Sequence, residues 1–327
     1  MKYGNYEYVS NKEFWDFYIK NSDNTDLLKY NIEKHRRNDL FNKYVTVVNL
    51  EVSSFCNRKC DYCPVADLVS KTKEFMQEDK FETVRSQLNE INFSGIITMN
   101  LFNEPLANPE FFIKRLKLLR SACPNSYIRI NTNGDYLTKD LLHKIKDAGI
   151  NEILVTLHKI KSESYDDVHQ MDKINSKIDS LGLREFSEFT NYEENKNITY
   201  EIRWQNIRLL IVSNNWSVYG VDRGGTVKKL SIKARVEPCL VPFREVTIDF
   251  NGYVLWCWNI FRDENYSFGN LKDSSLVDIY FSESAVDLRR KLITNNEKEG
   301  ICRTCNVSSY TNDNTEENRD LILEAAS

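Results

Sequence analysis

The sequence of 327 residues lacks the features that direct a chain to a membrane or a nucleic acid. It contains no apolar run of about 20 residues, the length that a membrane-spanning helix needs. Its first residues, Met1 to Tyr6, include no apolar stretch typical of a secretory signal. Its formal net charge is −4 without a block of basic residues, which disfavours nucleic-acid binding. We therefore expect a cytoplasmic protein that binds neither membranes nor nucleic acids.

Histidine is scarce but cysteine is not, since the chain has four histidines and eight cysteines. Because cytosolic thiols stay reduced, these cysteines indicate metal or cluster ligands rather than four disulfides. The length allows one large domain or two smaller ones. Hydrophobic residues make up 41% of the chain and aromatic residues 12%, which is ample for a packed core.

Three cysteines form a C-x3-C-x2-C motif at Cys56, Cys60 and Cys63, directly after an apolar segment at 45–52. With this cysteine content the spacing is expected by chance only about 0.005 times. Cysteine thiolates are the usual ligands of [4Fe–4S] clusters, and three of them bind three of the four irons. The fourth iron would stay open for a small molecule that chelates through an amine and a carboxylate. Structural zinc is the alternative, but it needs a fourth ligand and no histidine lies nearby.

A second set of cysteines lies in the last third of the chain, at Cys239, Cys257, Cys302 and Cys305. The C-x2-C pair alone is a weak signal, expected by chance about 0.2 times. The first two cysteines, however, flank a predicted hairpin at 245–256, which contains the turn sequence Asn251-Gly252. Four thiolates can ligate a whole [4Fe–4S] cluster or a structural zinc ion. We favour the cluster because the first motif already indicates iron–sulfur chemistry.

Strand-like and helical segments alternate from residue 45 onwards, which predicts a parallel sheet. We expect an α/β fold with an incomplete (β/α) barrel of five or six strands, followed by a small domain built from a β-hairpin and helices. The predicted strands cover 45–52, 95–102, 127–131, 152–157 and 207–213. The predicted helices cover 78–91, 109–122, 138–148 and, after the hairpin, about 274–283 and 285–294.

These patterns divide the chain into a helical extension at 1–44, the barrel at 45–225 and the small domain at 226–327. The extension has two apolar clusters that predict packing on the barrel, with a substrate lid as the alternative. Residues 160–205 contain a charged helix near 163–181 followed by polar sequence. We interpret this segment as a surface loop insertion, again with a lid as the alternative. Residues 311–327 are expected to form a polar helix or tail.

The first cysteine motif, with Tyr62 before its last cysteine, resembles the cluster loop of radical S-adenosylmethionine (SAM) enzymes. The resemblance implies a partial TIM-like (β/α)5–6 barrel and a [4Fe–4S] cluster whose open iron binds SAM. Reduction of that cluster, by a flavodoxin- or ferredoxin-type partner, cleaves SAM to a 5′-deoxyadenosyl radical. The second cysteine set resembles the twitch domain, a shortened SPASM domain, which implies one auxiliary [4Fe–4S] cluster. Further patches are similar to the radical SAM dehydrogenases: NEPL, TNGDYLT, VTLH, DRGG, PCLVP, FGNL and ICRTCN.

Polar residues at predicted strand ends are candidates for binding SAM, because active sites of parallel barrels lie at the C-terminal ends of the strands. Glu104 would accept hydrogen bonds from the SAM ammonium group, although Asn103 stands where the family usually has glycine. Asn131, Thr132 and Asn133 suit the ribose hydroxyls or the SAM carboxylate. Each of these groups has a turn-forming role as its alternative. The resemblance also places Tyr62 beside the cofactor.

The resemblance further implies a substrate pocket. Arg223 of the DRGG patch matches an arginine that contacts substrate in the dehydrogenases, and its donor fork suits an oxygen. His158 ends the fourth strand and is the candidate proton acceptor, with a structural role as its alternative. Three further positions match pocket-lining residues: Phe102, Asn131 and Trp258.

The resemblance therefore implies a dehydrogenase of a small aminocyclitol or sugar-like alcohol. The 5′-deoxyadenosyl radical would remove a hydrogen atom from the carbinol carbon, and the auxiliary cluster would receive an electron. One alternative is a peptide-modifying radical SAM enzyme, either an epimerase or a cross-linking maturase. The other is a non-catalytic zinc-binding protein.

Overall fold

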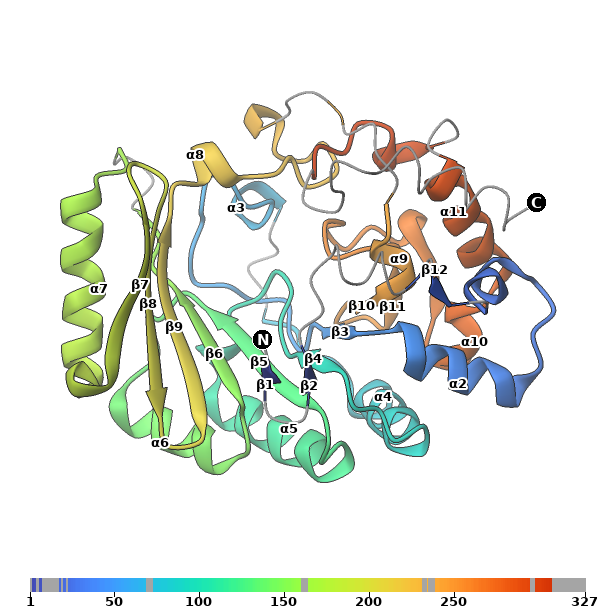
Figure 1. The fold of residues 1–327 in the computed structure, drawn as a ribbon, viewed down its shortest axis with the longest axis horizontal. Coiled ribbons are helices and arrows are strands. Elements are labelled where there is room, and N and C mark those ends of the chain that lie inside the picture. The colour runs from blue at the N-terminus through green and yellow to red at the C-terminus, as the bar shows by residue number, and fades with distance from the viewer. Residues whose placement is uncertain are drawn as a thin grey trace.

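The computed structural model describes residues 2–3, 6–7, 18, 20–21, 23–68, 73–159, 164–230, 234, 239–294 and 298–307. Its main feature is a ten-stranded sheet with the order β12-β11-β10-β3-β4-β5-β6-β9-β8-β7 (Figure 1). The strands from β10 to β9 in this order run parallel. Their bounds are β3 Val47–Leu50, β4 Ile96–Thr98, β5 Tyr127–Thr132, β6 Glu152–Thr156, β9 Ile207–Asn214 and β10 Glu245–Ile248. The α/β fold with a parallel sheet is thus confirmed.

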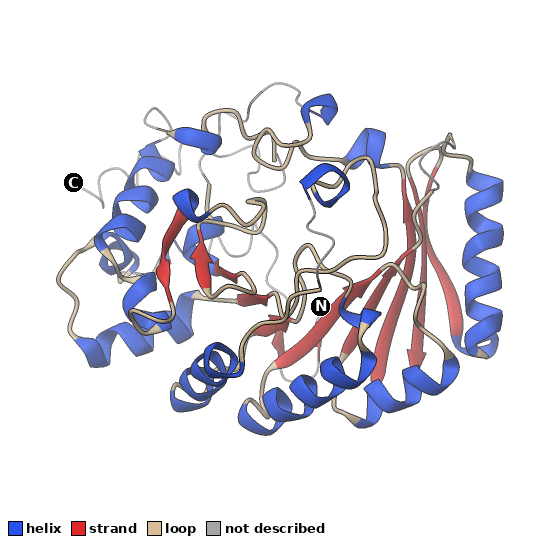
Figure 2. Cartoon of the chain, turned by 180° about the vertical axis from the view of Figure 1, so that it is seen from behind, coloured by secondary structure: helices blue, strands red, loops and turns tan. Residues whose placement is uncertain are grey.

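The central strands are apolar because both of their faces are covered. All residues of β3 and β4 are buried, as is typical of parallel sheets whose crossovers place helices on the faces. Helices α4 (Glu78–Glu90), α5 (Pro109–Ala122) and α6 (Lys139–Asp147) lie along the outer side of the curved sheet (Figure 2). The Asn108 side chain caps α5 by accepting from the Phe111 N–H at 3.2 Å, and Pro109 occupies its first turn.

The segment at 160–205 is only partly as expected. Helix α7 (Asp167–Leu181) confirms the predicted helix and ends at Gly182, which adopts a left-handed φ of 68°. The expected loop after it is wrong, because β7 (Ser187–Glu193) and β8 (Asn197–Trp204) form a hairpin on β9. The hairpin does lie at the surface, and β7 is almost wholly exposed. Its two aromatic residues, Phe189 and Tyr192, are exposed and three positions apart, so β7 lacks the alternating pattern of a half-buried strand.

The C-terminal region continues the same sheet. Strand β10 pairs with β3 in parallel and with β11 (Tyr253–Leu255) as the predicted hairpin. Strand β12 (Ser267–Asn270) extends the hairpin and was not predicted. Helices α10 (Leu276–Tyr280) and α11 (Glu283–Thr294) follow, close to the predicted positions.

The described part of the N-terminal extension packs on this framework, as expected. A 3-10 helix, η1 (Asn24–Leu28), and α2 (Lys34–Tyr44) bury Leu27, Phe41 and Tyr44. Tyr18 packs edge-on against Phe243 with ring centroids 5.3 Å apart. Most of the first predicted apolar cluster, near residue 15, and all of 311–327 lie outside the described residues. Of the helices that the structure describes, none is long and apolar enough to span a membrane.

Candidate active site

The first cysteine motif lies on the loop that leaves the C-terminal end of β3. Cys56, Cys60 and Cys63 are partly buried free thiols, and burial is the main cause that raises the pKa of Cys56 to about 12. The loop is fixed to the end of β5 by Arg58, whose Nε and Nη2 donate to the two Asp135 oxygens at 2.8 and 2.5 Å. The Asn57 amide donates to the same carboxylate at 2.7 Å. This anchor was not predicted from the sequence.

Glu104 lies close by, at the end of β4, and is almost fully buried. Its Oε1 accepts from the Thr132 hydroxyl at 2.6 Å and from the Leu106 N–H at 3.0 Å, and its Oε2 accepts from the Asn133 N–H at 2.7 Å. Burial raises the pKa of Glu104. A carboxylate offers about four acceptor sites, so Oε2 retains one for a further donor. The arrangement suits the predicted ammonium partner.

The neighbouring polar residues mostly form hydrogen bonds with one another. The Thr132 hydroxyl, predicted to face the ribose, also accepts from the Gly134 N–H at 3.1 Å. The Asn133 amide donates to Asn57 in the cysteine loop at 2.7 Å. Asn103 links the β4 turn to Ser53 at 3.0 Å. The Asn131 N–H donates to the Asn100 side chain at 2.7 Å. These contacts join the cysteine loop to the ends of β4 and β5.

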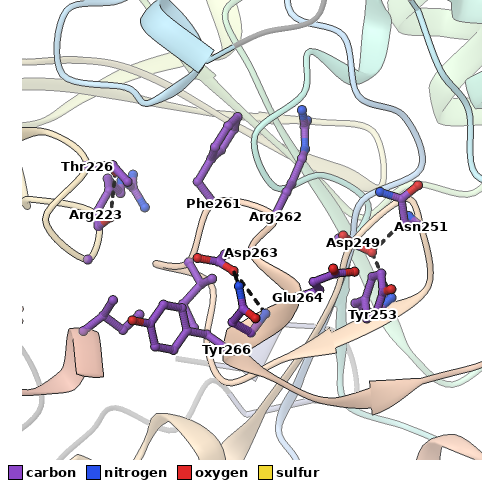
Figure 3. A pocket seen from close by; sticks show the side chains of 14 residues that line it. Arg223, Thr226, Asp249, Asn251, Tyr253, Phe261, Arg262, Asp263, Glu264 and Tyr266 are labelled. Atoms are coloured by element: carbon purple, nitrogen blue, oxygen red, sulfur yellow. Dashed lines mark hydrogen bonds between the residues drawn. The ribbon is translucent and has the colours of Figure 1, made fainter. Parts of the chain in front are cut away.

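Three of the predicted pocket residues meet. The guanidinium carbon of Arg223 lies 5.6 Å from the Phe102 ring centroid and 5.1 Å from that of Trp258, within cation–π range. Phe102 follows β4, whereas Trp258 directly follows Cys257. Arg223 is also close enough to Cys63 to favour its thiolate electrostatically. It lines a cavity of about 480 Å³ together with Phe261, Arg262 and Asp263 (Figure 3).

His158 follows β6 and contacts the cysteine loop. Its Nδ1 shares a hydrogen bond with the Tyr62 hydroxyl, and Tyr62 stacks on Trp216 with centroids 5.1 Å apart. Burial, and next the nearby Arg58 charge, lower the pKa of His158 to about 4. The side chain is therefore neutral at pH 7 and holds Tyr62 through this hydrogen bond, and its predicted part in proton transfer stays a prediction.

The other four cysteines also come together. One apolar cluster contains Leu288 and Leu292 together with all four of these cysteines, which are Cys239, Cys257, Cys302 and Cys305. Burial is the largest cause that raises the pKa of Cys257, and the neighbouring Cys302 and Cys239 add to it. The Asn259 amide lies 4.0 Å from the Cys305 Sγ. In the part of the chain that the structure describes, no group of three Cys, His, Asp or Glu side chains has the arrangement that binds a single metal ion.

Comparison with known proteins identifies the family of this chain. The profile described as the Radical SAM superfamily matches residues 50–218, just over half of the sequence. The chain belongs to the radical SAM superfamily. A second profile, SPASM, described as an iron-sulfur cluster-binding domain, matches residues 239–306. The predicted family, and SAM and [4Fe–4S] clusters as cofactors, are thereby confirmed, and the zinc-binding alternative is set aside.

Individual relatives agree with this assignment. The chain is 27% identical over 287 residues to the S-adenosyl-L-methionine-dependent 2-deoxy-scyllo-inosamine dehydrogenase of Niallia circulans, covering 86% of this chain and 99% of that protein. It is 30% identical over 147 residues to a GTP 3′,8-cyclase of Nautilia profundicola, covering 44% of each. The crystal structure of BtrN in complex with AdoMet and 2-DOIA has a TM-score of 0.59 at 23% identity, covering 82% of this chain and 95% of BtrN. That likeness shows a shared fold.

The residues present fit the cofactors of a radical SAM protein. Thiols gathered in a buried site resist ionisation, and bound iron supplies the positive charge that stabilises their thiolates. The groups of three and four match one cluster with an open iron and one that is fully ligated. The loop of three lies beside Glu104, whose N–H donates to the Phe55 carbonyl at 2.8 Å.

Proposed function

We propose that the protein is a radical SAM dehydrogenase that oxidises an alcohol carbon of an aminocyclitol or sugar-like small molecule. The observation that carries this proposal is the position of Arg223 between Phe102 of the barrel and Trp258 of the SPASM domain. A charged donor fork between the two cysteine sites suits a substrate that is rich in oxygen. The similarity to the inosamine dehydrogenase, which extends over 86% of this chain, supports the same substrate class.

We assign the cofactors to residues as follows. Cys56, Cys60 and Cys63 hold the cluster that binds SAM, and the four SPASM cysteines hold the auxiliary cluster. When bound, SAM and the two clusters supply the hydrogen-abstracting 5′-deoxyadenosyl radical and the acceptor for the second electron. Glu104 would accept from the SAM ammonium group through Oε2, which already accepts from the Asn133 N–H and has a second acceptor position. Tyr62, Asn103, Asn131, Thr132 and Asn133 shape the surrounding loop and strand ends.

Substrate oxidation converts C–OH to C=O. The carbon would lose a hydrogen atom to the 5′-deoxyadenosyl radical, the oxygen would lose a proton to solvent water, and one electron would pass to the auxiliary cluster. Arg223 donates hydrogen bonds to the substrate oxygen and keeps the carbinol carbon oriented. A guanidinium has no acceptor and does not deprotonate, so Arg223 binds and orients rather than acting as the base. Phe102 and Trp258 position the planar guanidinium through their ring faces.

An electron must enter from outside, and we infer a flavodoxin- or ferredoxin-type protein as the donor. Because seven of the eight cysteines are assigned to clusters rather than disulfides, we infer a cytoplasmic location, where thiols stay reduced.

Anaerobic incubation with dithionite, SAM and 2-deoxy-scyllo-inosamine tests the proposal. We expect 5′-deoxyadenosine and a ketone in equal amounts, measured by mass spectrometry, and neither product from Cys60→Ala. Formation of 5′-deoxyadenosine without a ketone from any aminocyclitol or sugar alcohol would refute the substrate class while leaving SAM cleavage intact.

A further inference from the structure

The loop that carries Arg223 is built on a strained turn. Arg223 itself adopts a left-handed φ of 52°, and Gly224 and Gly225 follow with φ of 65° and 84°. A left-handed conformation is unfavourable for a residue with a long side chain and persists only where its surroundings enforce it. The turn is closed by the Val227 N–H, which donates to the Asp222 carbonyl at 2.8 Å.

Asp222 supplies part of that enforcement. Its side chain is 1% exposed and accepts from the N–H groups of Gly224 and Gly225. Its Oδ1 is buried and has no hydrogen-bond partner among the described residues. A buried carboxylate with an unsatisfied oxygen costs stability. The bonds from Gly224 and Gly225 show that the carboxylate supports the conformation of the turn.

Asn306, one residue after Cys305, also helps to enforce the conformation of the Arg223 loop. Its Oδ1 accepts from the Asp222 N–H at 3.1 Å, and its Nδ2 donates to the Leu230 carbonyl at 2.7 Å. The two bonds span the beginning and the end of the Arg223 loop. Both hydrogen-bonding groups of one amide are thus used to bind this loop to the last cysteine motif.

Apolar contacts strengthen the same junction. Val221 packs on the cluster that contains the four SPASM cysteines. A Cβ at Gly224 would lie 3.2 Å from the Ile301 Cδ1, so this glycine approaches the residue before Cys302 closely. The loop after α8 (Trp216–Tyr219) and the last described segment lie side by side in Figure 1.

We infer that Asn306 and Asp222 are positioning residues that fix Arg223 to the last cysteine motif, so that assembly of the auxiliary-cluster site also orients the substrate-binding arginine. The role of Arg223 in binding substrate rests on the proposed function, but the mechanical link between loop and motif does not. In the absence of the ordered motif, the loop loses both Asn306 bonds and the Ile301 contact.

Hydrogen–deuterium exchange of the anaerobic holoprotein tests the link without any substrate. Asn306→Ala should increase deuterium uptake in 222–230 while iron and sulfide contents stay at the wild-type level. Cys302→Ala/Cys305→Ala should open the same segment. Thr304→Ala is the matched control, because this exposed hydroxyl makes one long hydrogen bond, to the Ile301 carbonyl at 3.5 Å, and it should leave the uptake unchanged.

Kinetics then separate positioning from folding. Asn306→Ala should raise the KM for the substrate about tenfold, as expected for two lost hydrogen bonds, with unchanged SAM cleavage in the absence of substrate. Asp222→Asn retains an acceptor for the two glycine N–H groups and should keep the wild-type KM, whereas Asp222→Ala should not. Unchanged uptake in 222–230, or loss of auxiliary iron in Asn306→Ala, would overturn the inference. If Asn306→Ala increases deuterium uptake in 222–230 but the wild-type protein oxidises no alcohol, only the proposed function is refuted.

Discussion

Arg262 of the SPASM region donates to both oxygens of Glu51, with Nε–Oε2 at 2.9 Å and Nη2–Oε1 at 2.7 Å. Glu51 is fully buried at the end of β3, a few residues before Cys56, and also accepts from the Phe102 N–H at 3.0 Å. Arg262 adds a bond to the Ser54 carbonyl at 2.9 Å and lies over the Phe261 ring. One side chain thus joins the C-terminal region to the root of the first cysteine loop.

We predict that Arg262→Ala lowers the free energy of unfolding by about 3–5 kcal/mol, because it leaves a buried carboxylate unpaired. Chemical denaturation under anaerobic conditions measures the change. Arg203→Ala is the control, because its ion pair with Glu201 involves an arginine side chain that is 74% exposed, and such pairs contribute about 0–1 kcal/mol. Equal effects of the two substitutions would contradict a stabilising role for the buried pair.

The sequence could not predict this contact, although it predicted most of the surrounding fold. Apolar runs such as 45–52 are rich in valine and almost wholly buried, so local pattern alone identifies them as strands. The β7 strand was missed because it is exposed and its sequence does not alternate between apolar and polar residues, and β12 was missed because a four-residue strand carries little pattern. Arg262 and Glu51 are 211 positions apart, and no local pattern relates them. A carboxylate that directly follows an all-buried strand, such as Glu51, is the available signal.

The same reasoning explains which site residues were predictable. Cysteine spacing reports ligand chemistry directly, and Arg223 belongs to a recognisable patch. The role of His158 depends on its partner Tyr62 and on burial, neither of which the sequence displays. Thr132 and Asn133 were placed at the correct strand end, but their hydrogen bonds to Glu104 and Asn57 arise only from folding.

The iron content should separate the two cysteine sites. We predict about eight irons and eight sulfides in the reconstituted wild type, on the basis of two [4Fe–4S] clusters. The triple variant Cys56→Ala/Cys60→Ala/Cys63→Ala should retain about four irons, because the SPASM thiols lie in a separate apolar cluster. Colorimetric iron and sulfide assays measure both. Complete loss of iron from the triple variant would show that the sites are not independent.

His158 should remain neutral throughout the physiological range. Its pKa is lowered to about 4, chiefly by burial, so only the unfolded state binds its proton between about pH 6.5 and pH 4. The contribution of His158 to stability therefore falls as the pH decreases through that window. We predict that His158→Gln weakens this acid sensitivity and leaves the pH profile of kcat/KM unchanged between pH 6 and 8. A wild-type ionisation near pH 6.5 that disappears in the variant would instead identify His158 as the base.

Arg223→Ala should impair alcohol oxidation far more than SAM cleavage. The guanidinium lies over the Phe102 and Trp258 rings, whereas Glu104 is held by Thr132, Leu106 and Asn133, so we expect the SAM site to remain intact. Loss of a hydrogen bond from a charged group costs about 1.5–3 kcal/mol, or a 10- to 150-fold fall in kcat/KM. Rates of ketone and of 5′-deoxyadenosine formation measure the two activities. Equal losses of both would assign Arg223 to folding or SAM binding.

The net reaction should be an oxidation and not an epimerisation, because an epimerase returns a hydrogen atom to the substrate radical, usually from a thiol. Seven cysteines belong to the two cluster sites, which leaves Cys123. This thiol is 1% exposed at the end of α5, and burial raises its pKa to about 11. It precedes β5, whose six residues place it roughly 20 Å from the C-terminal strand ends where SAM and Arg223 are assigned.

Hydrogen-atom transfer requires contact, so Cys123→Ala should keep full turnover, and product made in D2O should carry no deuterium at the attacked carbon. Deuterium at that carbon in the wild-type product would replace the dehydrogenase with an epimerase. A Cys123→Ala protein that cleaves SAM but makes no product would identify Cys123 as the hydrogen donor. Because a tyrosine can also donate hydrogen, the isotope result is decisive by itself.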